Sequence, residues 1–150
     1  MKGIGIRLAI IGAIALGAFL LRDRLSSNAG DLQAGDCFDV PTSPSETVDD
    51  VQHQPCSDPH TGEVVLVVDH TAPDDAPYPG DSEWDTFIGS NCVPAFNSYT
   101  GLDFDTEPTM GMGFFTPTDE GWKGGDRKVI CYATRVDKAP MNQSIKAGGG

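Results

Sequence analysis

The longest apolar run of the chain lies near its N-terminus. Leu8–Leu21 contains fourteen residues without a charge, and extension back to Gly3 gives nineteen residues broken only by Arg7. A helix of that length spans about 28 Å at about 1.5 Å per residue, close to the thickness of a bilayer's hydrocarbon layer. The pattern predicts a single transmembrane helix that stays on the protein as an anchor. A signal peptide cleaved before Gly30 is the alternative.

Beyond this segment, the hydrophobic positions follow the spacing of β-strands. Glu63–Asp69 is β-branched and apolar throughout its interior, which predicts a central strand covered on both faces. Shorter alternating patterns predict further strands at 36–40, 48–55, 112–116 and 127–136. The sheet is therefore expected to have four or five strands.

One helix is expected between the Pro-rich loop 71–80 and Gly101. Its apolar residues recur every three or four positions and so share one face: Trp84, Phe87, Ile88, Cys92, Ala95, Phe96 and Tyr99. Pro94 has no N–H to donate within a helix, so a kink or break is predicted near Asn91. The expected fold class is α+β, with a small antiparallel sheet packed by one broken helix.

These elements divide the chain into four parts. Residues 1–25 form the membrane anchor or signal sequence, and residues 26–31 form a short polar stalk. Residues 32–136 form the folded domain, with a turn rich in Gly and acidic residues at 118–126. The low-complexity end predicts a flexible tail over residues 137–150.

The charge of the chain limits its partners. The 150 residues contain 10 Lys and Arg against 22 Asp and Glu, for a net charge of −12. Residues 31–150 contain 6 basic and 21 acidic residues and so have a net charge of −15. A nucleic-acid-binding protein needs a basic face to pair with phosphates, so we expect no nucleic-acid partner.

The four cysteines indicate the compartment. All lie after the apolar segment, their number is even, and none belongs to a C-x-x-C pair. This pattern predicts two disulfides in an oxidising compartment, with four reduced, buried thiols as the alternative. We therefore expect a single-pass cell-membrane protein with its N-terminus in the cytoplasm and its domain outside. Three pairings are open, and neighbouring strands and a helix-on-sheet contact favour Cys37–Cys56 and Cys92–Cys131.

Small residues in the apolar segment repeat at four-residue spacing. Gly5, Ala9, Ala13 and Gly17 would form one ridge on a helix. Small residues allow a second helix to approach closely in a bilayer. The ridge predicts packing against another membrane protein, although a segment rich in Gly and Ala produces such a ridge by chance as well.

Candidate chemistry is sparse. His60 and Glu63 lie three residues apart, with His53 nearby, and such residues can ligate a metal. The preferred interpretation is structural, with His60 hydrogen-bonded to the backbone of the turn that begins at Cys56. The sequence contains no nucleophile motif such as G-x-S-x-G or S-x-x-K. We therefore expect no catalytic residue, no bound metal and no cofactor.

Several of these residues together resemble the bacterial septum-formation family. The resemblance covers about residues 32–136, and its most specific part runs from Cys56 through Pro59-His60 to Glu63-Val64. The other matching residues are Gly35-Asp36-Cys37-Phe38, Val51, Tyr78-Pro79-Gly80, Cys92, Phe96, Tyr99, Pro117, Trp122, Gly125-Asp126-Arg127 and Cys131. The resemblance implies an N-terminal membrane helix and a role in the division septum or cell envelope, with no assigned reaction.

Together these features predict a non-enzymatic, membrane-anchored envelope protein. It would act as a protein-binding or accessory subunit of a membrane complex, through its helix and its outer domain. The alternative is an extracytoplasmic ligand- or metal-binding protein, or an enzyme, that uses the His60–Glu63 region. An open cleft of polar groups around His60 would favour the alternative, and a buried His60 with all its hydrogen bonds made would favour the first hypothesis.

Overall fold

The computed structural model describes residues 29–42, 51 and 53–148. The predicted anchor and its ridge of small residues lie outside the described residues. No helix in the described ranges is both long enough and apolar enough to cross a membrane.

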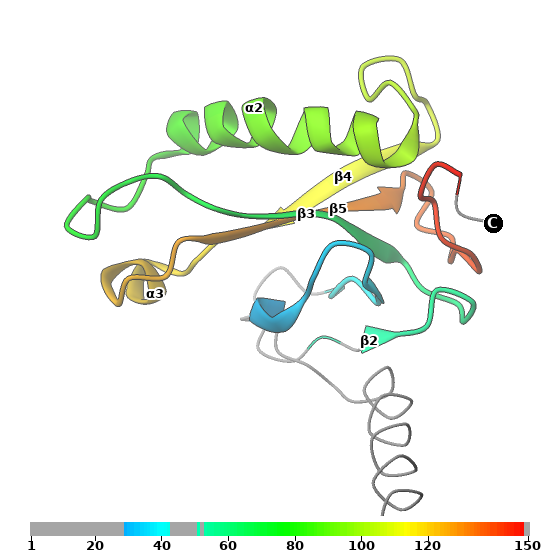
Figure 1. Cartoon of the computed structure of the whole chain (residues 1–150), viewed down its shortest axis with the longest axis horizontal. Coiled ribbons are helices and arrows are strands. Elements are labelled where there is room, and N and C mark those ends of the chain that lie inside the picture. The colour runs from blue at the N-terminus through cyan, green and yellow to red at the C-terminus, as the bar shows by residue number, and fades with distance from the viewer. Residues whose placement is uncertain (1–28, 43–50, 52, 149–150) are drawn as a thin grey trace, which may run out of the picture.

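The described chain forms one antiparallel sheet of five strands, with a long helix on one face (Figure 1). The strand order is β2-β1-β3-β5-β4, and every adjacent pair is antiparallel. The elements in chain order are η1 (Ala29–Asp31), β1 (Cys37–Phe38), β2 (His53–Gln54), β3 (Gly62–Asp69), α2 (Asp81–Thr100), β4 (Met110–Phe115), α3 (Asp119–Lys123) and β5 (Lys128–Arg135). The predicted α+β class and strand number are confirmed.

Strand β3 lies in the middle of the sheet and is covered on both faces, as its apolar sequence predicts. Val65 packs with the residues under α2, whereas Val64 belongs to a second cluster on the opposite face. The pairing with β5 shifts register between Val64 and Leu66, so Val67 also faces the second cluster. Such a bulge adds one residue to the alternation of a strand.

Helix α2 is continuous, so the predicted break near Asn91 is wrong. Pro94 lies inside the helix on its exposed side. The missing N–H leaves one backbone carbonyl without a helix partner, and water can reach that carbonyl on the exposed side. The buried face runs at four-residue spacing through Trp84, Ile88, Cys92 and Phe96, and this packing holds the helix in one piece.

The acidic segment 118–126 contains a short helix rather than only the predicted turn. Thr118 caps α3 by accepting the N–H of Gly121 at 3.0 Å. The cap turns Trp122 into the core, where its indole N–H donates to the carbonyl of Ala76 at 2.8 Å. The guanidinium of Arg127 lies 3.8 Å from the centre of the Trp122 ring. These contacts anchor α3 and the Pro-rich loop to the sheet.

Both predicted boundaries of the domain differ from the structure. Ala29 of the expected stalk is buried in η1, so residues 29–31 belong to the domain. The expected tail after residue 136 is packed: Met141 is 8 % exposed and forms an antiparallel bridge with His60. The low complexity at 147–150 gives no sign that the preceding residues are packed, although Ile145 donates to Glu63 and also packs against the apolar core under α2.

Gly113 is predicted to be the most sensitive glycine of the sheet. A Cβ there would lie 2.3 Å from the ring of Tyr132 on β5, so Gly113→Ala should lower the free energy of unfolding by about 1–3 kcal/mol. Gly89→Ala is the matched control, because its Cβ would meet nothing within 4 Å on α2. The control should stabilise the protein by about 0.5–1 kcal/mol. Denaturant unfolding of the full chain in detergent measures both, and equal midpoints for Gly113→Ala and wild type would contradict the packing described.

Candidate functional site

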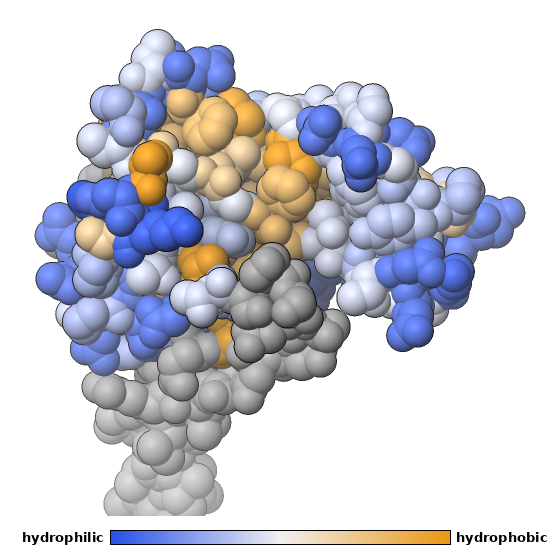
Figure 2. Space-filling view, turned by 180° about the vertical axis from the view of Figure 1, so that it is seen from behind, coloured by the Kyte–Doolittle hydropathy of each residue, from blue (hydrophilic) through white to orange (hydrophobic). Residues whose placement is uncertain are grey.

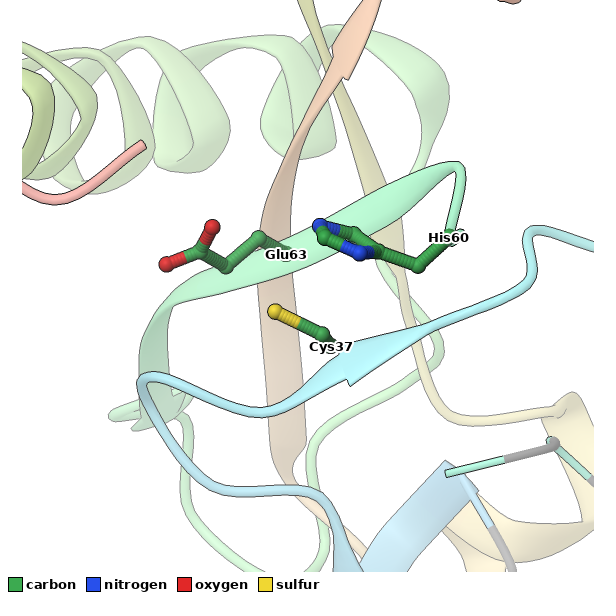
Figure 3. Close-up of side chains that lie close together, drawn as sticks. All are labelled: Cys37, His60 and Glu63. Atoms are coloured by element: carbon green, nitrogen blue, oxygen red, sulfur yellow. The ribbon is translucent and has the colours of Figure 1, made fainter. Parts of the chain in front are cut away.

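Three segments bring Cys37, His60 and Glu63 together beneath the end of α2. Cys37 on β1 pairs directly with Glu63 on β3, and only Thr61 separates His60 from the start of β3. One sulfur, nitrogen or oxygen atom from each lies within 4.8 Å of the others. All three residues are 0 % exposed. Figure 3 shows the Cys37 sulfur directed between the His60 ring and the Glu63 carboxylate. We call these three residues the buried cluster.

The Glu63 carboxylate is held by donors from two other parts of the chain. Its Oε1 accepts the hydroxyl of Tyr99 on α2 and the hydroxyl of Ser144, each at 2.6 Å. Its Oε2 accepts the backbone N–H of Ile145 at 2.8 Å. A buried carboxylate needs such donors to replace the water it loses on folding. Glu63 therefore joins the central strand, the long helix and the C-terminal segment.

His60 is fixed at its backbone and at one ring nitrogen. Its backbone N–H and C=O pair with Met141 at 2.9 and 2.7 Å. Its Nδ1 lies 2.8 Å from the carbonyl of Asp58 in the preceding turn, which is the backbone contact expected from the sequence. A carbonyl only accepts, so Nδ1 is the donor, and in the neutral tautomer with this donor the lone pair of the ring is on Nε2. That Nε2 has no hydrogen-bond partner within the described residues, so His60 is buried without being fully bonded.

The environment of the Tyr99 hydroxyl keeps it protonated, so that it can donate to the Glu63 carboxylate. Burial raises the pKa of Tyr99 well above its usual range, and the hydrogen bond to Glu63 and the charge of Glu63 raise it further. The phenol consequently stays neutral and remains a donor at any physiological pH.

The two disulfides are those favoured from the sequence, and that prediction is confirmed. Cys37–Cys56 joins β1 to the turn before His60, with a Cα–Cα distance of 5.2 Å. Cys92–Cys131 joins α2 to β5 at 5.7 Å. A disulfide sulfur is not a thiolate, so in this oxidised state the buried cluster offers a metal only an imidazole and a carboxylate. That donor set is too small for a structural zinc site.

The sequence placed some residues of this site and missed others. His53, suggested as a third ligand, instead pairs through Nε2 with Asp36 at 3.2 Å. The third residue of the buried cluster is Cys37 instead of His53, because Cys37 lies opposite Glu63 in the sheet. A single sequence does not show which residues of two strands lie opposite each other when a loop separates the strands. It also does not show the contacts of Ser144 and Ile145 with Glu63.

Comparison with known families decides what kind of domain this is. The sequence profile of a family described as septum formation matches residues 34–148. The chain belongs to the septum-formation family. The match includes the whole buried cluster and the C-terminal segment that covers it. A septum-formation domain indicates a role in cell division or in the cell envelope. Searches of curated proteins and of solved structures gave no match.

Replacement of Tyr99 by Phe tests the Glu63 hydrogen bonds. At pH 7 Tyr99→Phe should lower the free energy of unfolding by about 1–3 kcal/mol, because a buried carboxylate loses a donor. The raised pKa means that the folded state holds the phenol proton after the unfolded state has lost it. The contribution of this pKa difference to the free energy of unfolding is complete below pH 10, the ordinary pKa of a tyrosine. It is lost as the pH rises toward the pKa of Tyr99 in the folded state.

The stability gap between wild type and Tyr99→Phe should therefore narrow as pH rises above 10. Lysines and the other tyrosines titrate in both proteins and cancel in the difference. Denaturant unfolding at a series of pH values measures the gap. A gap that stays constant from neutral to strongly alkaline pH would show that the phenol makes no such hydrogen bond.

Proposed function

We propose that this septum-formation protein is a non-enzymatic, membrane-anchored accessory subunit that binds another envelope protein through strand β4. The anchor is the apolar helix of residues 1–25, with the N-terminus in the cytoplasm and the domain outside. The observation that carries the proposal is an uncharged, partly exposed strand at the edge of the sheet.

The buried cluster supports a structural role for His60 and Glu63 rather than catalysis. A catalytic group must touch its substrate, and all three residues of the cluster are 0 % exposed. Each Glu63 oxygen already accepts a hydrogen bond from the protein. A substrate could reach Glu63 only after the C-terminal segment had moved away.

Strand β4 has the features of a docking edge. It is the last strand in the order of the described sheet, it has the sequence MGMGFF, and Phe114 is 45 % exposed. Edge strands of monomeric proteins usually carry charges, prolines or bulges that prevent pairing with other chains. Figure 2 shows apolar side chains gathered on the face seen from behind, the side on which β4 lies. Such an edge accepts an extended segment of a partner by strand addition.

The charges around β4 favour a basic partner over a second copy of this chain. Acidic residues precede the strand, at Asp103, Asp105 and Glu107, and follow it, at Asp119 and Glu120. Antiparallel pairing of two β4 strands would bring the two acidic ends of the copies together, and like charges there are destabilising. An extended segment with an apolar centre and Lys or Arg at both ends fits instead.

Co-purification of the full chain from membranes in mild detergent tests both contacts. Phe114→Lys should reduce recovery of the partner several-fold, because it removes an apolar contact and repels basic flanks. Ala13→Leu with Gly17→Leu should do the same by blocking close helix packing, without changing membrane insertion. An excess of a synthetic peptide of alternating Val and Thr with Lys at both ends should displace the partner.

Each variant has a matched control. Leu102→Lys places the same charge on an exposed apolar residue outside β4, and Ala15→Leu with Ala18→Leu alters another face of the helix. The same peptide with Glu at both ends should leave the partner bound. The proposal is wrong if the variants and their controls recover the same proteins in equal amounts.

A further inference from the structure

We propose that reduction of the Cys37–Cys56 disulfide converts the buried cluster of Cys37, His60 and Glu63 into a binding site for a divalent transition-metal ion, best fitted to Zn²⁺. This inference is independent of the function proposed for β4. It starts from the one ring nitrogen of the cluster that lacks a partner.

His60 is arranged as a metal-binding histidine usually is. Its Nδ1–H donates to the carbonyl of Asp58 at 2.8 Å, which fixes the ring and leaves the lone pair on Nε2. Metal-ligating histidines almost always donate their second nitrogen to a carbonyl or carboxylate in this way. Nε2 is fully buried without a hydrogen-bond partner in the described structure, and Figure 3 shows the ring extending toward Glu63 and the Cys37 sulfur. A metal ion would satisfy this nitrogen.

Glu63 keeps capacity for one more interaction. A carboxylate has about four lone-pair sites, and the donors from Tyr99, Ser144 and Ile145 occupy three of them. Only one of these donors reaches Oε2, so this oxygen retains a lone pair. The same three donors orient the carboxylate, as the outer-shell partners of metal ligands do.

Cys37 supplies the thiolate once its disulfide is opened. A dithiol reductant passes two electrons and two protons to the disulfide, which gives Cys37–SH and Cys56–SH while the dithiol becomes a disulfide. Zn²⁺ then replaces the thiol proton of Cys37, which passes to solvent, and a Zn–S bond forms. Cys56 is partly exposed, whereas Cys37 is 0 % exposed, so the reductant meets the Cys56 sulfur first.

The distances are compatible with a tetrahedral site after a small adjustment. Zinc bonds of about 2.0–2.3 Å place the ligand atoms of a tetrahedron roughly 3.3–3.7 Å apart. The three atoms of the cluster lie within 4.8 Å of one another before any ion binds. Thiolate, imidazole and carboxylate together are a zinc-type donor set, and Cys56 or water completes the fourth position.

The Cys56→Ser variant tests the site without any reductant. It frees the Cys37 thiol and leaves Cys92–Cys131 intact. The full chain in detergent should then bind one Zn²⁺, measured by competition with a metal-sensitive dye. Co²⁺ in its place should give the absorption bands of a tetrahedral site and a thiolate-to-cobalt band. His60→Ala in the Cys56→Ser background should weaken binding at least tenfold.

Cys37→Ser is the matched control. It also leaves one free thiol, but that thiol belongs to Cys56 and not to Cys37 of the buried cluster. It should bind Zn²⁺ at least a hundredfold more weakly, and oxidised wild type should show no thiolate-to-cobalt band. Equal binding by the two serine variants, or by oxidised and reduced wild type, would overturn the proposal. If Cys56→Ser does not fold, wild type that has been reduced with a dithiol and then freed of it is tested in its place, and absence of the cobalt band there would overturn the proposal as well.

Discussion

A carboxylate without solvent contact, at the start of the central strand, determines how this domain is assembled. Burial of an ionised group is unfavourable unless hydrogen bonds replace its water. Glu63 obtains them from the Tyr99 hydroxyl on α2 and from Ser144 and Ile145 near the C-terminus. The fold must therefore bring together segments about eighty residues apart in the sequence, and the C-terminal segment becomes part of the domain.

The two disulfides and the apolar core hold the segments that meet at Glu63 in place. Cys92–Cys131 fixes α2 on the sheet, and Cys37–Cys56 fixes β1 and the turn that carries His60. Apolar clusters lie on both faces of β3, and two donors to the carboxylate, Tyr99 and Ile145, pack against the cluster under α2. A small acidic domain with a modest core gains from such crosslinks, each worth about 3 kcal/mol in the chain-entropy account. The same disulfide that braces β1 also holds the Cys37 sulfur beside His60 and Glu63, which is why its redox state would decide whether a metal can bind.

Local patterns in the sequence were enough to predict the main strands and the position of the long helix, and to favour the disulfide pairing that the structure has, but not the short helix α3. The β-branched run at 63–69 and the four-residue spacing in α2 each reflect burial of one element against its neighbours, so a single sequence displays them. Pro94 led to the wrong prediction of a broken helix, because the low helix propensity of proline does not indicate which side of the helix faces water. The packing of Met141 and Ile145 was not predictable, because the backbone of each bonds to a buried polar residue far away in the chain, His60 or Glu63, and a single sequence does not display such contacts. Family resemblance identified His60 and Glu63 as a signature, and the structure shows the hydrogen bonds behind it.

Hydrogen exchange at the Ile145 amide tests the central claim most directly. This N–H donates to Glu63 Oε2 at 2.8 Å in a segment whose sequence is typical of a flexible tail. The account predicts that in the wild-type protein this amide is strongly protected and exchanges only with opening of the domain, and that Glu63→Gln removes most of the protection. Exchange of the wild-type amide at the rate of an unstructured peptide would contradict it, because the carboxylate would then not hold the C-terminal segment.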